Sequence, residues 1–539
     1  MIDSFIHIKS LTFKYNTTIM KNLKKILFLG LFLLLQTTLF AQLSSKQIDD
    51  LTNTALQKFN VAGTGVAVIK DGKVIHMKGY GLSSVTTKEK VNEHTRFAIA
   101  SNSKAFTSMA LSILVDRKQL KWTDKVVDYI PDFKMYDSYV TANFTIVDLL
   151  THRSGLGLGA GDLMFFPDGS DFTIDDILNN FQNLKPVSAF RTKYDYDNLL
   201  YLVAGELVKR VSGMSWEEFV TTRILEPLKM EHTYASIDLM KDKNNLAFPH
   251  ANSDSTLNIL ESYQSMVNGA AGGIYSNVND MCEWMKMHLN DGAYGDSLEN
   301  SLFGKQSHRE MWKIHTVTEA NRDPRYNNHF AGYGLGWVLS DMNGKMSVSH
   351  TGGLPGMLSK VIMIPDINLG VVVLTNTSDD GAGVFASVTQ TIVDSYLGLD
   401  DFNWVDMYSF YFQMNKSVSD SVTIKVWETV DAVVEDAVDS AAYVGVYKDT
   451  WFGKVEVLKK DGEIWFKSSR SPKLTGRMYF YKANSFAIKW DYRDMNADAF
   501  AMFVLDEEGK ATGIKMKGIS PNIDFSFDFQ DLDFERVEE

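Results

Sequence analysis

A serine and a lysine one helical turn apart are the residues whose types and spacing most directly indicate chemistry. Ser101 and Lys104 lie in the segment Phe97–Thr107, where an apolar approach leads into a predicted helix start. Residues at i and i+3 of a helix share a face. A serine hydroxyl is a weak nucleophile until a base takes its proton, and a neutral lysine one turn away could be that base. We therefore predict that Ser101 is a covalent nucleophile.

Two further polar motifs strengthen this hypothesis. Ser-x-x-Lys alone is weak, because average composition gives roughly two by chance in a chain of this length, although it occurs only once here. Tyr196-Asp197-Asn198 precedes a predicted buried helix, so a phenol and an amide can project from a loop end. His350-Thr351-Gly352-Gly353 ends a predicted strand, where glycines let a substrate backbone approach closely.

Composition excludes several classes of function. The 539 residues carry a net charge of −13, which argues against a nucleic-acid partner, since phosphate binding needs a basic face. Two or three domains are expected at this length. The single cysteine, Cys282, excludes an internal disulfide framework and a cysteine-rich metal site, and its predicted helix favours a buried structural thiol. We expect no cofactor and no metal.

The amino-terminal segment is typical of an export signal. Met20–Lys25 is positively charged, Ile26–Leu35 is apolar, and Leu39–Ala41 before Gln42 is a plausible cleavage site. Residues 1–19 do not fit the signal, so Met20 is an alternative first residue. An uncleaved anchor also remains open. We expect a periplasmic or secreted protein that is not stably inserted in the membrane after cleavage.

The elements that must position the motifs predict an α+β fold. Asp-Gly and Asn-Gly pairs between β-rich runs predict two hairpins. The expected elements are strands 65–70, 73–77, 334–339, 345–350, 360–364 and 370–375 and a final helix 384–396, with a helix-rich middle. An antiparallel sheet built from both ends, flanked by helices and joined to a separate helical region, accounts for this order. Residues 156–190 read as an insertion that could overhang the site.

The carboxyl-terminal part predicts a small all-β domain. Residues 399–440 form an acidic linker with some helix, and short strands with turn signals follow from Tyr443. The strands expected are 454–458, 464–468, 478–482, 486–492, 499–505 and 514–518, which suggest a small antiparallel barrel or sandwich. It contains no catalytic constellation, so we expect a supporting, oligomerising or ligand-covering role. The predicted domains are 1–41, 42–398, 399–440 and 441–539.

Together the motifs resemble the penicillin-recognising serine hydrolases, which comprise class C β-lactamases, DD-peptidases and their esterase and aminopeptidase relatives. The middle motif looks like the class C and esterase branch, whereas the last motif begins with His350 in place of lysine. The resemblance runs from about Ser45 to Leu397, and the segments Leu150–Leu156 and Gly272–Ser276 also match. The tail resembles the lipocalin-like barrel appended to some members.

The resemblance implies a role for each motif residue. Ser101 attacks a carbonyl, and Lys104 with Tyr196 shuttles its proton. A tyrosine pKa near about 10 must fall for the phenolate to act as a base, and Lys104 is a sensible source of that field. The backbone N–H groups of Ser101 and Gly353 form the oxyanion hole. Asn198 binds Lys104 or the substrate amide.

Structural alternatives stand beside these roles. Tyr196 could pack at a helix start, Asn198 could cap the helix, and His350 could end a strand without touching substrate. His152 and Arg153 are better explained as residues that hold their loop.

Three functions follow from this interpretation. The first is an exported serine hydrolase that cleaves an ester, amide or peptide bond of a small molecule or peptide through an acyl-enzyme. The alternatives are a β-lactamase or penicillin-binding DD-peptidase, and a non-catalytic cell-wall-binding protein on the same fold. A homo-oligomer is compatible with each.

We predict measurable hydrolysis of p-nitrophenyl acetate or butyrate and weak or no cephalosporin hydrolysis. A histidine with a reference pKa of about 6.5 is largely neutral at pH 7, so His350 lacks the fixed charge that would bind a lactam carboxylate. Parallel assays with nitrocefin and the two esters check this ranking. Fast nitrocefin turnover without esterase activity would reverse it.

Overall fold

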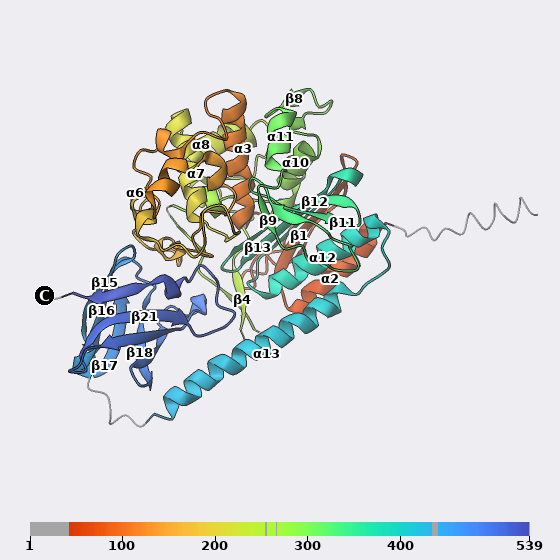
Figure 1. Ribbon diagram of the computed structural model, residues 1–539. Coiled ribbons are helices and arrows are strands. Elements are labelled where there is room, and N and C mark those ends of the chain that lie inside the picture. Colours follow the sequence, from red (N-terminus) through yellow and green to blue (C-terminus); the bar gives the residue numbers. More distant parts are fainter. Residues whose placement is uncertain (1–41, 254–255, 266, 434–439, 538–539) are drawn as a thin grey trace, which may run out of the picture.

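The computed structural model describes residues 42–253, 256–265, 267–433 and 440–537. The predicted export signal and residues 1–19 lie outside this part of the chain. Within it, no helix combines the length and the hydrophobicity that a bilayer crossing requires. Figure 1 shows a sheet with helices on both sides, a helical region beside it and a separate barrel.

The sheet has eight strands and is antiparallel throughout. The first two strands come from the amino end, and the first of them (Gly63–Lys70) pairs with the last sheet strand in sequence (Leu369–Thr375), so segments from both ends of residues 42–398 build the sheet, as predicted. In sheet order the strands are β2 (Lys73–Gly81), β1 (Gly63–Lys70), β14 (Leu369–Thr375), β13 (Met357–Ile364), β12 (Lys345–Leu354), β11 (Val338–Met342), β10 (Ala331–Tyr333) and β9 (Thr316–Thr318).

Both predicted hairpins are present. Asp71 and Gly72 join β1 to β2 with φ of 51° and 74°, and Asn343 and Gly344 join β11 to β12 with φ of 49° and 73°. Two successive positive φ angles match the twist of the flanking strands, which is why Asx-Gly pairs are favoured there.

The prediction of a strand over 334–339 is wrong. β10 ends at Tyr333 and β11 begins only at Val338, because the chain turns between them. Gly336 has a φ of 80°, and the Gly334 amide donates to the Trp337 carbonyl at 2.8 Å. The segment before this turn holds the short strands β9 and β10, which are too short to show an alternation of apolar and polar residues.

Helices cover both faces of the sheet. Side chains alternate along β1, so Val66 and Val68 join one core and Ala67 and Ile69 join the other. The helices involved are α2 (Ser45–Phe59) and α12 (Asp380–Leu397) on the first face and α10 (Val278–Leu289) on the second. Because β1 and β14 are covered on both sides, nearly all their residues are buried.

The helical region is built around α3 (Ser103–Asp116), whose residues are buried from Ser103 to Leu114. Phe106 stacks on Trp284 with ring centroids 4.9 Å apart, which ties α3 to α10. The other helices here are α4 (Ser138–Asn143), α5 (Ile146–Leu149), α6 (Ile174–Asn180), α7 (Leu199–Ser212), α8 (Trp216–Val220), α9 (Gly269–Gly272) and α11 (Lys305–Met311). A helix buried all round gives the residues at its start a rigid base.

A closed eight-stranded barrel follows the long helix α13 (Trp404–Asp431), which occupies most of the described part of the predicted acidic linker. The strands are β15 (Gly445–Asp449), β16 (Gly453–Lys460), β17 (Glu463–Ser468), β18 (Thr475–Lys482), β19 (Ser485–Trp490), β20 (Ala499–Leu505), β21 (Ala511–Gly518) and β22 (Asp533–Arg536). The six predicted strands are β16 to β21. The first and last, which pair with each other to close the barrel, were missed. The predicted fold class is confirmed, whereas the domain boundaries stay a prediction.

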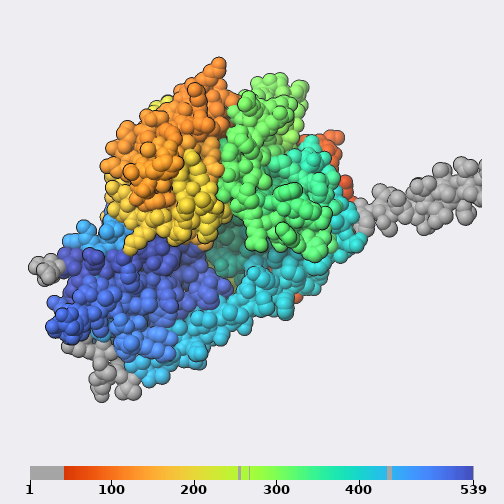
Figure 2. All heavy atoms as spheres, viewed as in Figure 1, coloured from red at the N-terminus to blue at the C-terminus, as the bar shows by residue number. Residues whose placement is uncertain are grey.

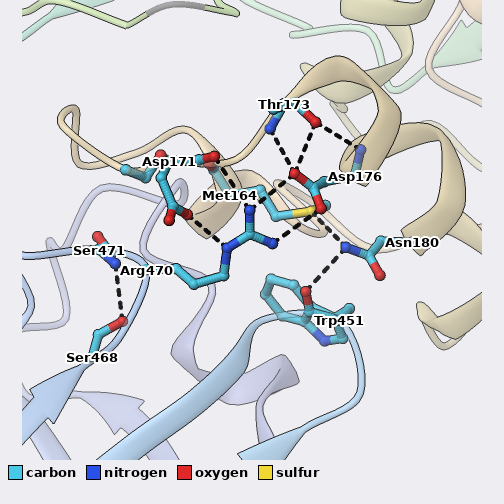
Figure 3. Close-up of polar contacts among 10 residues, drawn as sticks. Met164, Asp171, Thr173, Asp176, Asn180, Trp451, Ser468, Arg470 and Ser471 are labelled. Carbon is cyan, nitrogen blue, oxygen red and sulfur yellow. Dashed lines mark hydrogen bonds and ion pairs between the residues drawn. The ribbon is translucent and has the colours of Figure 1, made fainter.

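The barrel packs against the segment 156–190 (Figures 1 and 2). Arg470 between β17 and β18 pairs with Asp171 at 2.6 Å and with Asp176 at 2.9 Å (Figure 3). Its guanidinium also lies 3.8 Å from the centre of the Phe172 ring. Asn180 donates to the Trp451 carbonyl at 3.1 Å. The predicted insertion, residues 156–190, therefore forms the surface on which the barrel packs.

Candidate active site

The predicted nucleophile lies on a strained turn that β12 holds from one side. Ala100 has a φ of 48°, which is unusual for a residue with a side chain. Ser101 follows in a short 3₁₀ turn and is partly exposed. A Cβ on Gly352 would lie 2.2 Å from the Ile99 carbonyl oxygen and 2.9 Å from the Ser101 nitrogen. Only glycine therefore lets β12 pass this close.

Lys104 is fully buried directly beneath the serine. Its Nζ lies 3.0 Å from Ser101 Oγ, 2.7 Å from Asn198 Oδ1 and 3.0 Å from the Ala271 carbonyl oxygen. The two carbonyl oxygens can only accept, so they take N–H groups, whereas the serine hydroxyl can also donate. A neutral amine has two N–H groups and one lone pair, which fits these three partners with Ser101 O–H pointing at the lone pair.

Burial lowers the pKa of Lys104 to about 7, while the negative charges of Asp162 and Asp197 oppose the shift. Burial also raises the pKa of Asp197 to about 7. Charging an amine in a site without water is costly, so a large neutral fraction is present at neutral pH. The sequence hypothesis that Lys104 can act as a base is thus physically reasonable.

The expectation that Lys104 lowers the pKa of Tyr196 is wrong. Burial raises this pKa well above its usual value, and only a hydrogen bond with the Ser101 side chain acts clearly in the other direction. Lys104 Nζ lies 4.8 Å from the centre of the Tyr196 ring, and the ring packs on His152 at 4.2 Å. Burial of the phenol outweighs the charge on Lys104, whose own pKa is about 7. Tyr196 therefore keeps its proton.

Asn198 does not cap α7, although it occupies the N-cap position, because its side chain makes no capping bond to the described backbone. The neighbouring Asp197 accepts the Leu200 N–H at 3.3 Å instead. Asn198 Oδ1 faces Lys104, and its Nδ2 donates to Asp162 Oδ2 at 2.7 Å. The predicted contact between Asn198 and Lys104 is present, and the alternative of a helix cap is wrong.

His350 has both ring nitrogens engaged by the protein. Nδ1 lies 2.6 Å from the Thr351 carbonyl oxygen, which can only accept, so Nδ1 carries the proton. Nε2 then accepts from the Tyr333 hydroxyl at 2.8 Å. Burial, helped by the charge of Lys104, lowers the pKa of His350 to about 3. His350 is neutral at physiological pH, and no sequence motif pointed to Tyr333 on β10.

His152 and Arg153 hold their loop, as expected. His152 Nδ1 accepts the Asp197 N–H at 3.1 Å, and burial lowers the pKa of His152 well below its usual value. Arg153 pairs with the buried Asp148 at 2.9 Å.

Gly353 lies beside the nucleophile's turn, as its predicted oxyanion-hole role requires. It is exposed, pairs with Leu358 across the sheet and directly follows Gly352, whose backbone packs on Ser101. Its role remains a prediction. Sequence reasoning missed Asp162, which lies in the segment 156–190 without a recognisable motif.

The Beta-lactamase family matches residues 48–388, well over half of the chain. This chain belongs to the Beta-lactamase family. The resemblance inferred from the motifs is therefore confirmed, and the family is one of serine hydrolases. A second match, to a domain of unknown function (DUF3471), covers residues 431–536 and hence the barrel.

Named relatives agree with this assignment. Protein flp of Staphylococcus aureus strain MW2 is 28% identical over 348 residues, which span 62% of this chain and 64% of that protein. Unguisins hydrolase ungD of Aspergillus violaceofuscus is 25% identical over 436 residues, or 76% of each chain.

Solved structures share the fold. The octameric penicillin-binding protein homologue from Pyrococcus abyssi covers 91% of this chain and 100% of its own, with a TM-score of 0.57 at 19% identity. The match to the penicillin binding protein from Bacillus halodurans covers 63% of this chain and 98% of that protein, with a TM-score of 0.52 at 21% identity.

We predict that kcat/KM for an ester substrate rises about tenfold per pH unit below pH 7 and levels off above it. The amine of Lys104 accepts a proton only when neutral, and its neutral fraction increases as pH rises through its pKa. Lys104→Arg should lower kcat/KM at least about 100-fold, because a guanidinium does not deprotonate.

The surface variant Lys58→Arg is the matched control and should keep the wild-type profile. In Asp197→Asn the rise of kcat/KM with pH should move to lower pH, because the variant loses a negative charge that favours the ammonium form of Lys104. A rise that disappears in Asp197→Asn would assign the titration to Asp197 and contradict the prediction.

Proposed function

We propose that this protein hydrolyses ester, amide or peptide bonds through an acyl-enzyme on Ser101. The observation that carries the proposal is the buried Lys104 amine, 3.0 Å from Ser101 Oγ, with its two other partners able only to accept. A serine O–H aimed at an amine lone pair is the arrangement that activates a nucleophile. The name of the relative ungD, a hydrolase, supports the same class of reaction.

In the proposed acylation, the Ser101 proton passes to Lys104 while Oγ bonds to the substrate carbonyl carbon. The oxyanion that forms accepts the N–H groups of Ser101 and Gly353, and each such donor is typically worth about 3–4 kcal/mol. Tyr196, protonated by virtue of its raised pKa, donates its proton to the leaving oxygen or nitrogen. Lys104 then returns its proton to Tyr196, and water reverses the sequence to release the acid.

The neutral His350 favours substrates without a carboxylate at that position. Its proton is committed to the Thr351 carbonyl and its lone pair to Tyr333, so it offers no charge to an anion. A small, mainly apolar pocket lies at the end of β12, the strand that carries Gly353. Its lining includes Ala98, Leu354, Met357 and Tyr275. We therefore rank small esters and amides above β-lactams, and keep a β-lactamase or DD-peptidase activity and a non-catalytic binding protein as alternatives.

We expect a fluorophosphonate probe to add to the wild-type chain once and to leave Ser101→Ala unlabelled, because the probe traps an activated serine. Intact-protein mass spectrometry followed by peptide mapping measures the adduct. Ser417→Ala, an exposed serine on α13, is the matched control and should label like wild type. Absence of labelling on wild type, or equal labelling of Ser101→Ala, would exclude the proposed nucleophile.

Export is a separate proposal, supported by the charged and apolar runs of residues 20–41. When the chain is expressed from Met20 in a bacterial host, the mature mass should begin at Gln42, and the protein should leave the cytoplasm. An intact amino terminus on the mature protein would refute cleavage. A homo-oligomer also stays a prediction; the Pyrococcus abyssi neighbour is octameric, which is a property of that protein.

A further inference from the structure

A loop of the barrel reaches the polar network behind the proposed nucleophile. We call residues 519–532, which connect β21 to β22, the barrel loop. Its Ser526 donates to Asp162 Oδ2 at 2.9 Å, and Asn198 donates to the same oxygen at 2.7 Å. Asn198 in turn accepts from Lys104 at 2.7 Å. A barrel side chain is thus three hydrogen bonds away from the proposed base.

All members of this series are buried, so water does not compete for their bonds. Asp162 and Lys104 are fully buried, Ser526 is 7% exposed and Asn198 is 8% exposed. Buried polar networks of this kind fix side-chain orientation, because an unmade bond is costly there. Because Asp162 Oδ2 accepts a hydrogen bond from Asn198 Nδ2, the amide oxygen Oδ1 of Asn198 must face Lys104. A rotated amide would present N–H groups to an amine that needs acceptors.

A second residue of the barrel loop holds the backbone around Asp162. Asp528 accepts the Gly161 N–H at 2.6 Å and the Leu163 N–H at 3.0 Å with its two carboxylate oxygens. These amides flank Asp162 on both sides. The Asp528 side chain therefore fixes the turn that carries Asp162, because its two oxygens bridge the two backbone donors.

The barrel loop also contacts Tyr196 of the candidate site. The ring of Phe525 contacts the Tyr196 ring edge-on at 5.8 Å between centroids, and Phe525 is 39% exposed. A Cβ on Gly159 would lie 2.6 Å from the Phe525 carbonyl oxygen, so the turn before Asp162 needs glycine for the approach.

Ion pairs elsewhere keep the barrel in this position. Arg470 is held by Asp171 and Asp176 (Figure 3), and Lys473 pairs with Asp168 at 3.0 Å. These contacts and the barrel loop all lie on the segment 156–190, against which the barrel packs in Figure 2. These ion pairs therefore help to fix the position of the barrel loop relative to Asp162.

We propose that the barrel supplies one residue to the active site, Ser526, which acts as a positioning residue through Asp162 and Asn198 on Lys104. The proposal rests on the proposed function, since Lys104 must be the base that Ser526 helps to align. It assigns the barrel a defined role in catalysis, beyond support of the fold. Ser526 itself touches neither the substrate nor the reacting atoms.

The test is the second-order rate of fluorophosphonate labelling in the full-length chain. Ser526→Ala should lower this rate about tenfold, the size expected for losing one buried hydrogen bond. Ser526→Thr keeps a hydroxyl and should restore most of the rate. Ser520→Ala is the matched control on the same loop, because its hydroxyl bonds Ser419 of α13 and lies outside the network. It should label like wild type.

A double-mutant cycle separates positioning through Asn198 from a general loss of structure. If Ser526 acts through Asn198, then Ser526→Ala should add little to the defect of Asn198→Ala, since the pathway is already cut. Two independent defects that multiply would overturn the proposal, as would a wild-type labelling rate in Ser526→Ala. Failure of the wild-type chain to label would instead refute the proposed function, so the two failures are distinguishable.

Discussion

The burial of the Lys104 amine is the constraint on which the rest of the site depends. An ammonium ion excluded from water loses hydration that protein groups replace only in part, so its pKa falls to about 7. The surrounding acceptors, Asn198 and the Ala271 carbonyl, satisfy the two N–H groups of the neutral amine and leave its lone pair for Ser101. The fold obtains this burial by enclosing α3 on all sides.

The groups around the amine are consistent with a neutral site. Tyr196 keeps its proton because burial penalises the phenolate, and His350 stays uncharged because burial and Lys104 both disfavour the imidazolium. A lysine at position 350 would place a second amine in the same enclosure. The departure from the lysine of the related motif is therefore compatible with the electrostatics of the site, and in our proposal it disfavours substrates with a carboxylate at that position.

The barrel supplies a feature that the hydrolase region lacks by itself. Ser526 and Asp528 bind a turn whose sequence, Gly159–Leu163, has little regular structure of its own. The contacts form only when the barrel is docked on this turn, because they join residues far apart in the sequence. Asp162 and Ser526 are 364 positions apart, and Gly161 and Asp528 are 367 positions apart. Fixing so long a loop costs chain entropy, and the ion pairs of Arg470 and Lys473 help to offset it.

The sequence by itself determined the features that depend on local pattern. The Asp71-Gly72 and Asn343-Gly344 turns follow from the positive φ that such pairs adopt. The closeness of Ser101 and Lys104 follows from their spacing across the 3₁₀ turn Ala100–Asn102 and the start of α3. Most of the longer strands were found, whereas β15 and β22, which pair with each other to close the barrel, were not.

Only the tertiary structure decided the ionisation and the partners of these residues. The sequence indicated the opposite direction for the pKa of Tyr196, because burial is a property of the packed site and outweighs a neighbouring amine. The roles of Tyr333, Asp162 and Ser526 depend on side chains brought together from distant segments, which carry no local pattern. The choice of candidate reactive residues thus rests on local information, whereas their charge and alignment are set by burial and docking.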